Sequence, residues 1–540
     1  MSDFLDAQLG SYQTAVNQAI SDLTSQNILN RIWNHDYTVW EPDPEEITNR
    51  LGWLHLPQKM VDNLDEIQSL VDAVKADGYT HALLLGMGGS SLAPEVFSKT
   101  FGPDSDGLTL QVLDSTNADA INDYAKSLEF SRTLFIVSTK SGGTVETQSF
   151  FKYFYNQVVG ELGKESAGEH FVAITDPGSK LEKQAQTYHF RQTFLNDPNI
   201  GGRYSALSYF GLVPAALVGV DVALLLQRAA AMTGPEGNDA GAELGAIMGV
   251  CAKNGRDKIT IVTSSPISSF GDWVEQLIAE STGKIGKGIL PVVGAPVGPP
   301  DVYSSDRLFV HLRLAGDQRD TQALAALAAA GHPIVQIEMA DKYDMGGQFF
   351  LWEMATAVAG YLIGIHPFNQ PNVESAKKRA TAMVNAYQEK GQLPKSDSEP
   401  LITEKLIEFL SHAKPGDYIA IQAYVQPTAE MDNTLQSLRL LLRKRTKLAV
   451  TVGYGPRFLH STGQLHKGDG GNGLFVQFTS EAAETVAIPE TAGEDASAIT
   501  FNVLITAQAL GDGQALRDEN RRVIHFHLGR NPLAALEQIL

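Results

Sequence analysis

Residues 81–94 read HALLLGMGGSSLAP, an apolar run that passes directly into a Gly- and Ser-rich turn. The same order recurs at 133–144, where TLFIV is followed by STKSGGT, and at 172–178, where VAIT is followed by DPG. Short apolar runs that end in such turns and alternate with helical patterns are typical of buried parallel strands in βαβ units. We therefore predict an α/β fold whose first part is a doubly wound parallel sheet.

The alternation of strand and helix patterns continues along the rest of the chain. Further strand patterns lie at 259–263, 308–314, 334–337, 418–424, 448–452 and 474–478. Turn-forming residues at 233–239 and a polar stretch at 395–400 predict two boundaries, and residues 1 to about 65 show helical patterns without strands. The predicted parts are an N-terminal helical segment at 1–65, α/β domains at 66–235 and 236–394, and a C-terminal α/β extension at 395–540.

The composition excludes several classes of protein. With 540 residues, 43% hydrophobic and 19% charged, the chain is neither disordered nor fibrous. The 62 acidic residues outnumber the 42 basic ones, which gives a formal charge of −20 and disfavours nucleic acid and anionic lipid as partners. A small anionic substrate would therefore need a local site of backbone N–H groups, helix N-termini or a few cations.

Cysteine content and terminal sequence favour a cytoplasmic protein. The single cysteine, Cys251, can form no intramolecular disulfide and no cysteine cluster for zinc. The N-terminus is acidic and lacks the pattern of a signal peptide. The most apolar stretch, 212–226, contains Asp221 and is too short to span a bilayer, so it predicts a buried helix.

Two strand-end turns are candidate phosphate sites, because ligands of open α/β sheets bind beyond the carboxyl ends of the strands. The turn with Gly88, Gly89 and Ser90 offers bare amides and a hydroxyl, although such turns are often only steric solutions. The turn at 138–144 adds the hydroxyls of Ser138, Thr139, Ser141 and Thr144 ahead of a predicted helix at Val145. It lacks the Walker pattern and suits a phosphomonoester; the alternative is a Ser/Thr-rich helix cap.

A third candidate is the turn at 199–205, which reads NIGGRYS. Gly201 and Gly202 precede Arg203, and an Arg held by a tight turn can bind an anion or stabilise negative charge that develops on an oxygen. The alternative is a surface Arg in an ordinary ion pair.

Together, these segments resemble the phosphoglucose isomerase family. Residues 86–94 are similar to its Gly-Ile-Gly-Gly-Ser-x-Leu-Gly-Pro, with Met87 and Ala93 departing, and 199–205 match its Gly-Gly-Arg-Tyr/Phe-Ser. Residues 139–146 are similar to Ser-Lys-Ser-Gly-Thr-Thr-x-Glu, where Gly143 removes one hydroxyl.

Two downstream segments extend the resemblance. Residues 273–284, WVEQLIAESTGK, are similar to the family segment Glu-Ser-x-Gly-Lys that carries the catalytic carboxylate, here Glu280. Residues 368–377, FNQPNVESAK, are similar to Phe-Asp-Gln-x-Gly-Val-Glu-x-x-Lys, with Asn369 and Asn372 departing. The motifs together span roughly residues 80 to 380.

One further motif lies outside its usual place. Residues 459–464, LHSTGQ, are similar to the Leu-His-Ser-x-Gly-Gln that bacterial members carry soon after the catalytic Glu, but here they follow the Lys377 motif. The chain therefore looks most like the isomerase portion of fused transaldolase/phosphoglucose isomerase proteins.

The resemblance implies two SIS (sugar isomerase) domains and a glucose-6-phosphate isomerase of glycolysis and gluconeogenesis that uses neither metal nor cofactor. Glu280 would move a proton between C1 and C2 of the sugar, Arg203 would stabilise the cis-enediolate, and Lys377 with His460 would open the ring. The resemblance also implies a cytoplasmic homodimer. The substrate-binding candidates are Gly88, Gly89, Ser90, Thr139, Lys140, Ser141, Thr144, Gly202 and Gln370.

Other interpretations remain open from the sequence alone. A non-catalytic sugar-phosphate sensor would need Ser141 and Thr144 but has no use for Glu280 or Lys377. An isomerase that accepts mannose 6-phosphate as well as glucose 6-phosphate would need Glu280 and Lys377, and the sequence does not distinguish the two sugars. His525 and His527 share one face of a strand pattern, which a metal could use, but without a nearby carboxylate motif a hydrogen-bonded or edge role is expected. The basic run at 439–447 is expected to be solvated or paired with acidic residues.

Overall fold

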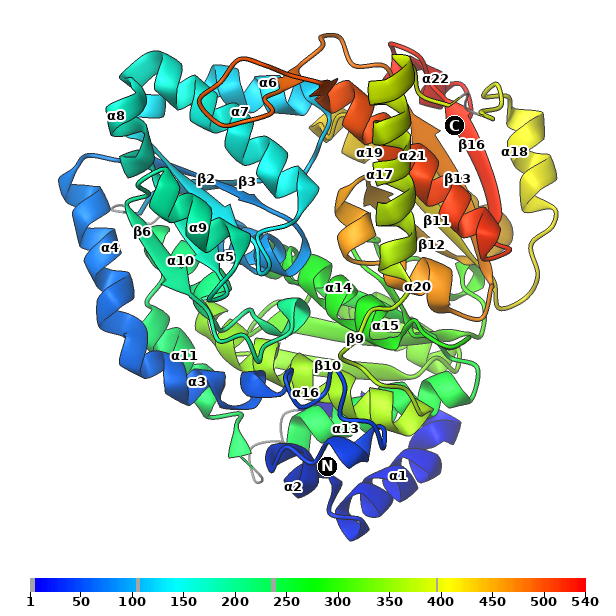
Figure 1. Cartoon of the computed structure of the whole chain (residues 1–540). Coiled ribbons are helices and arrows are strands. Elements are labelled where there is room, and N and C mark those ends of the chain that lie inside the picture. The colour runs from blue at the N-terminus through cyan, green and yellow to red at the C-terminus, as the bar shows by residue number, and fades with distance from the viewer. Residues whose placement is uncertain (1–4, 103–106, 235–238, 395–396) are drawn as a thin grey trace.

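The computed structural model describes residues 5–102, 107–234, 239–394 and 397–540. Three main sheets, built almost entirely of parallel strands and covered by helices, confirm the predicted α/β class (Figure 1). The predicted boundaries at 233–239 and 395–400 fall in part outside the described residues, and the limits of the four predicted parts stay a prediction.

The first sheet has the order β3-β2-β4-β5-β6 and is parallel throughout. Its strands are β2 (His81–Gly86), β3 (Thr109–Leu113), β4 (Thr133–Ser138), β5 (Phe171–Thr175) and β6 (Gln192–Leu195). The sequence patterns predicted the three central strands, which are almost wholly buried, but not the two edge strands. Edge strands face solvent on one side, so their polar residues interrupt the apolar run.

The second sheet has the order β1-β10-β9-β7-β8. Its strands are β1 (Leu5–Gln8), β7 (Lys258–Thr263), β8 (Leu290–Val292), β9 (Arg307–Leu314) and β10 (Ile334–Met339). The expectation that residues 1–65 contain no strand is wrong, because β1 pairs antiparallel with β10 at the sheet edge. A four-residue strand completed by a partner distant in the sequence leaves no local periodicity to detect.

The third sheet, order β12-β11-β13-β16, is also parallel and forms the core of the C-terminal extension. Its strands are β11 (Tyr418–Tyr424), β12 (Ala449–Tyr454), β13 (Gly473–Thr479) and β16 (Arg522–His527). A short antiparallel pair, β14 (Ala487–Ile488) with β15 (Ile499–Thr500), lies outside these sheets.

Helices cover both faces of the sheets and carry most of the polar motifs at their ends. The main ones are α1 (Gln13–Ser25), α4 (Leu64–Ala76), α5 (Leu92–Phe101), α6 (Ala118–Ser127), α7 (Val145–Leu162), α9 (Lys180–Thr187), α13 (Asp239–Lys253), α14 (Phe270–Thr282), α15 (Thr321–Ala329), α16 (Met345–Ile363), α17 (Val373–Lys390), α18 (Thr403–Leu410), α19 (Ala429–Thr446), α20 (Gly463–Gly468), α21 (Phe501–Asp518) and α22 (Pro532–Glu537). Among the described helices, none is both long and apolar enough to cross a membrane.

Two expectations about helices need correction. The apolar stretch 212–226 forms parts of two helices, α10 (Tyr209–Leu217) and α11 (Val222–Ala230), because Asp221 accepts a hydrogen bond from Leu224 N and caps the second. The basic run on α19 is not simply solvated. Arg439 is 5% exposed and donates to Val450 O, and Arg443 donates to Pro296 O and the Tyr303 hydroxyl.

The first two sheets share one apolar core, in which α5, α14 and α16 pack together. Phe97 of α5 lies 5.4 Å from Phe349 of α16, measured between ring centroids. The third sheet has its own core and contacts the second sheet through a smaller apolar cluster that includes Leu290 and Tyr418. The helix α17 packs along α21 of the extension (Figure 1), and Ile488, Phe501 and Leu504 of the extension join the apolar core on one face of the first sheet.

Candidate functional site

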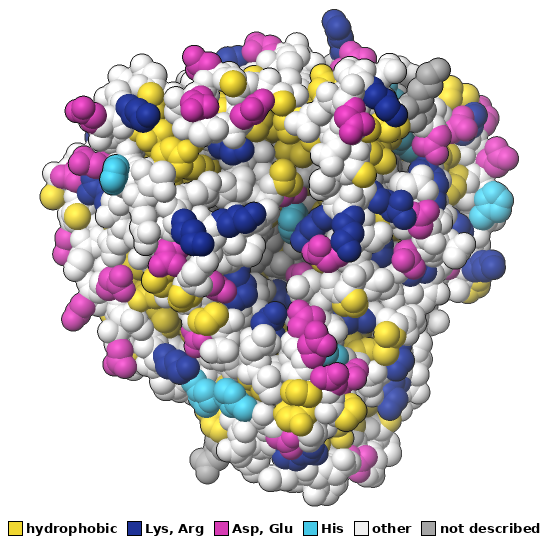
Figure 2. Space-filling model, in the orientation of Figure 1, with side chains coloured by type: hydrophobic (Ala, Val, Ile, Leu, Met, Phe, Trp, Pro, Cys, Tyr) yellow, Lys and Arg dark blue, Asp and Glu magenta, His cyan; other side chains and the backbone are white. Residues whose placement is uncertain are grey.

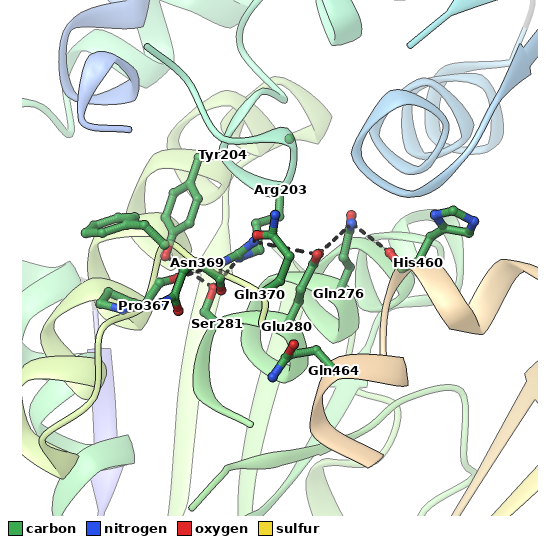
Figure 3. A network of polar contacts seen from close by, with 12 residues as sticks. Arg203, Tyr204, Gln276, Glu280, Ser281, Pro367, Asn369, Gln370, His460 and Gln464 are labelled. Carbon is green, nitrogen blue, oxygen red and sulfur yellow. Dashed lines mark hydrogen bonds and ion pairs between the residues drawn. The ribbon is translucent and has the colours of Figure 1, made fainter. Parts of the chain in front are cut away.

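Glu280 and Arg203 come together where α14 meets the turn at 202–204 (Figure 3). Glu280 Oε1 lies 3.6 Å from Arg203 Nη1, and their side chains are 13% and 3% exposed. A carboxylate and a guanidinium this close in a largely dry site form a base next to a fixed positive charge. The two residues are far apart in the sequence, and the fold joins them.

The Arg203 guanidinium is held in place by four hydrogen bonds. It donates from Nε to Ser281 Oγ at 2.8 Å and from Nη1 to Gln370 Oε1 at 2.9 Å. Nη2 donates to the carbonyl oxygens of Pro367 and Asn369 at 2.8 and 3.0 Å. The turn before α17 thus fixes the orientation of the guanidinium, and Gln370 lies next to it.

Each Asn that departs from the resembled motif has a partner here. Asn369 Oδ1 accepts a hydrogen bond from Lys284 Nζ at 2.9 Å, and Lys284 also donates to His366 O at 2.6 Å. Burial and the nearby Arg203 charge lower the pKa of Lys284 well below its ordinary value. Asn372 Oδ1 accepts from Gln464 Nε2 at 2.7 Å, and Gln464 belongs to the displaced motif.

Gln276 is a site residue that the sequence analysis did not single out. It lies one turn before Glu280 on α14, is 4% exposed, and donates from Nε2 to Glu280 Oε2 at 3.0 Å and to His460 O at 2.8 Å. Within the part of the chain that the structure describes, its Oε1 has no hydrogen-bond partner. The i, i+4 spacing within the motif 273–284 was the signal that could have identified it.

His460 reaches this region from the C-terminal extension of the same chain. It ends the short helix η12 (Arg457–His460), and its Nε2 lies 3.0 Å from Oε1 of Glu146, a residue of α7 whose side chain is 5% exposed. Burial raises the pKa of Glu146, but the charge and hydrogen bond of His460, with Lys377 nearby, lower it below its ordinary value overall. Glu146 is therefore the anionic partner of His460.

The turn at 139–144 lies just before α7 and presents hydroxyls and amides. The Thr139 and Thr144 hydroxyls are 3.1 Å apart, and Gly143 N donates to Ser141 Oγ at 3.2 Å. Gly142 has φ +70°, and a Cβ there would meet Leu181 N at 2.4 Å, so only glycine fits. Lys140 does not face this group, since its Nζ pairs with Asp176 and donates to Pro198 O.

The turn with Gly88, Gly89 and Ser90 packs tightly against the other site loops. A Cβ on Gly89 would lie 2.1 Å from Gly202 O, and one on Gly88 would lie 2.9 Å from both Gln276 Nε2 and His460 O. The backbone of Ser90 accepts a hydrogen bond from Ser138 Oγ at 3.0 Å. These glycines therefore allow the close approach of the loops that carry Arg203 and His460.

A cavity of about 400 Å³ lies beside this network. Ser141, Thr144, Lys377 and His460 are among the residues that line it. Lys377 is 53% exposed and its Nζ lies 3.3 Å from Glu374 Oε1. The predicted phosphate turn and the two predicted ring-opening residues therefore line one cavity. Gln276 donates hydrogen bonds both to Glu280 and to the backbone of His460, and so links the Glu280–Arg203 pair to the edge of this cavity (Figure 3).

The surface charge around the site contrasts with the net charge of the chain. Figure 2 shows a hollow in the middle of this face, bordered by several Lys and Arg side chains together with some Asp and Glu, although the formal charge of the whole chain is −20. Basic side chains gathered at a hollow raise the local potential for a small anion relative to the repulsive overall field.

The His525 and His527 pair does not form a metal centre of three or more ligands. Both imidazoles contact Thr479 Oγ1, through His525 Nε2 at 2.8 Å and His527 Nδ1 at 3.0 Å. Within the described ranges, no group of three or more His, Cys, Asp or Glu side chains could hold a metal ion.

Comparison with known proteins places the chain near one enzyme family. The family model described as Phosphoglucose isomerase matches residues 55–285. Over 381 residues the chain is 29% identical to a glucose-6-phosphate isomerase of Rubrobacter xylanophilus, and the match covers 61% of this chain and 87% of that protein. Over 390 residues it is 26% identical to the Parabacteroides distasonis glucose-6-phosphate isomerase, covering 62% and 87%.

Solved structures support the fold. A hypothetical protein from Thermus thermophilus superposes with a TM-score of 0.58 at 23% identity, covering 70% of this chain and 99% of that one. A glucose-6-phosphate isomerase from Chlamydia trachomatis gives a TM-score of 0.50 at 20% identity, covering 60% and 74%. At these identities the likeness concerns the fold alone.

Proposed function

We propose that this chain, a distant relative of the phosphoglucose isomerase family through residues 55–285, interconverts glucose 6-phosphate and fructose 6-phosphate. The observation that carries the proposal is the largely buried Glu280–Arg203 pair, which Gln276 links to the backbone of His460 at a cavity lined by hydroxyls and Lys377. A sugar-phosphate sensor has no need of that pair.

In the proposed reaction, Glu280 moves a proton between C1 and C2 through a cis-enediolate. Arg203 stabilises the enediolate oxygens, because its charge is fixed by four hydrogen bonds and needs no reorganisation during the reaction. Gln276 and Gln370 orient these two groups and contact substrate hydroxyls.

Ring opening falls to Lys377 and His460, which line the same cavity. Glu146 accepts a hydrogen bond from the proton-bearing nitrogen of His460 and so leaves the other ring nitrogen to exchange a proton with the ring oxygen. Thr139, Ser141 and Thr144, with amides of the turn, bind the phosphate and position C1 and C2 near Glu280. Gly88, Gly89 and Gly202 allow the site loops to pack closely together, and the Ser90 hydroxyl contacts the substrate. Lys140, which faces Asp176, is left out of the proposed phosphate site.

The proposal extends to where the protein works and how it assembles. The protein works in the cytoplasm, in glycolysis and gluconeogenesis, without metal or cofactor, and forms a homodimer. The 459–464 motif follows Lys377, whereas ordinary bacterial members carry it soon after the catalytic Glu. This position supports a likeness to the isomerase portion of transaldolase/phosphoglucose isomerase fusions. Acceptance of mannose 6-phosphate depends on small shifts in the cavity and is an outcome of the assay below.

The test is turnover of fructose 6-phosphate by the purified chain in EDTA, coupled to glucose-6-phosphate dehydrogenase. We expect Glu280→Gln to lower kcat by about 100-fold or more with little change in KM. The matched control is Glu275→Gln on the same helix, which should retain activity. An inactive wild type whose Tm rises with fructose 6-phosphate would favour a sensor, and turnover of mannose 6-phosphate would favour the dual isomerase.

A further inference from the structure

Gln508 is a buried polar residue of the C-terminal extension that contacts the candidate site. It lies on α21 and is 2% exposed. Its Nε2 donates to Glu146 Oε1 at 2.7 Å, and its Oε1 accepts from the Thr116 hydroxyl at 2.7 Å. The same Glu146 oxygen lies 3.0 Å from His460 Nε2. Four side chains are thereby joined in the order Thr116, Gln508, Glu146 and His460.

The hydrogen-bond roles in this series are determined by chemistry. An ionised carboxylate can only accept, so the Gln508 amide must present its NH₂ group to Glu146. A flip of the amide would place its oxygen against the Glu146 carboxylate, so Glu146 fixes the orientation and the Thr116 hydroxyl donates to the Gln508 oxygen at the other end. Thr116 is fully buried, and Gln508 and Glu146 are 2% and 4% exposed, so little of these side chains meets solvent although both also line the cavity.

The orientation of His460 depends on the same carboxylate. With Glu146 as an acceptor, His460 carries its proton on Nε2, and Nδ1 keeps a lone pair that can exchange a proton with a sugar oxygen. If the carboxylate turned away, either nitrogen could carry the proton and the imidazole would lose its fixed position.

We propose that Gln508 is a positioning residue for ring opening: anchored by Thr116, it holds the Glu146 carboxylate and, through it, sets the tautomer and orientation of His460. This inference rests on the proposed isomerase function. It assigns a task to the C-terminal extension, which supplies both His460 and Gln508 to a site whose phosphate turn belongs to the first sheet.

The kinetic test compares two substrates. Gln508→Leu keeps a similar volume but removes both hydrogen bonds, and we expect kcat with fructose 6-phosphate to fall about 10- to 100-fold, with KM changed less. With 5-deoxyfructose 6-phosphate, which has no O5 and cannot close a ring, the variant should stay close to the wild type. An equal loss on both substrates, or no loss on either, overturns the proposal.

Control variants separate positioning from folding. Gln477→Leu removes another Gln of the extension, 1% exposed on β13, and should change Tm without the substrate-selective loss. Thr116→Val removes the hydroxyl that anchors the amide and should lower kcat in the same substrate-selective way, whereas Thr116→Ser keeps the hydroxyl and should retain activity.

A spectroscopic readout keeps the inference separate from the proposed function. Nitrogen-15 NMR of labelled histidine, with the signal assigned through His460→Gln, should show His460 protonated on Nε2 in the wild type and a tautomer mixture in Gln508→Leu. An unchanged tautomer in the variant overturns the role of Gln508. Absence of isomerase turnover by the wild type would reject the proposed function but leaves this measurement valid.

Discussion

At the level of single residues, the departures from the resembled motifs are compensated by neighbouring side chains. Asn369 accepts a hydrogen bond from the buried Lys284, and Asn372 exchanges hydrogen bonds with Gln464. Both contacts involve residues that only the fold brings close. A motif position can therefore change without loss of the local structure where a buried partner satisfies the new side chain.

Gly143 is a departure without such compensation, and it predicts a gain of function. A Cβ at this position would meet only Ser141 Oγ, at 3.6 Å. Gly143→Ser therefore fits and adds a hydroxyl to the phosphate turn. We expect KM for fructose 6-phosphate to fall by about 3- to 10-fold at unchanged kcat, as one added hydrogen bond to a charged group allows. Gly142→Ser should instead impair folding; equal effects of the two variants would contradict the prediction.

Glu275 predicts a pH dependence of stability. Burial, reinforced by the charge of Asp272, raises the pKa of Glu275 to about 8. Between about pH 5 and 8 the unfolded chain loses this proton while the folded chain keeps it, so this group destabilises the fold as the pH rises. We expect the Tm of Glu275→Gln, relative to that of the wild type, to increase over this range in calorimetry. A Tm difference between the two proteins that does not change with pH would contradict this role of Glu275.

At the level of elements, the short helix η12 separates two cavities. Arg457, Phe458 and Ser461 line a cavity of about 640 Å³ at the junction of the sheets, while Leu459 and His460 line the candidate site. On α14, Glu275 faces the junction and Glu280 faces the site. The position of His460 is thus tied to the packing on the far side of η12.

Arg457 anchors η12 and predicts a large loss of stability. Its guanidinium pairs with Glu95 and, at 2.9 Å, with Asp114, and its side chain is 24% exposed. Arg457→Met would leave Asp114 without this cation and Glu95 paired only with the exposed Lys99, and we expect a loss of about 3 kcal/mol in the free energy of unfolding. Arg530→Met, which breaks a pair with Glu481 and replaces an 87% exposed side chain, is the matched control and should cost little. Similar Tm values for the two variants would show that Arg457 is not an anchor.

For the molecule as a whole, one chain supplies every residue of the candidate site. Glu280 and Arg203 flank the core shared by the first two sheets, and His460, Gln508 and Gln464 come from the extension. Side chains from all three parts meet without a second subunit. We therefore expect the proposed isomerase activity to need no partner chain.

This arrangement predicts that activity does not depend on assembly. The turnover per chain should stay constant when the protein is diluted from micromolar to nanomolar concentration, because dissociation of a dimer removes no site residue. Activity is measured at each dilution and the mass of the particle by light scattering or mass photometry. A loss of turnover that follows dissociation would show that a partner subunit completes the site.

The α/β class, the central strands and the site motifs could be predicted from the amino-acid sequence. Buried parallel strands such as 133–138 and 418–424 are continuous apolar runs, so their pattern is local and visible. The turns with Gly88, Gly142 and Arg203 were identified for the same reason, since their chemistry lies in a few adjacent residues.

Which of these residues meet depends on the tertiary structure. The β1 strand, the split of residues 212–226 into two helices, the pairing of Lys140 with Asp176 and the contacts of Gln276, Glu146 and Gln508 could not be predicted from local patterns. Buried polar groups must find hydrogen-bond partners, and these partners are set by packing across elements that are distant in the sequence. The fold, not the order of motifs, brings His460 to the candidate site.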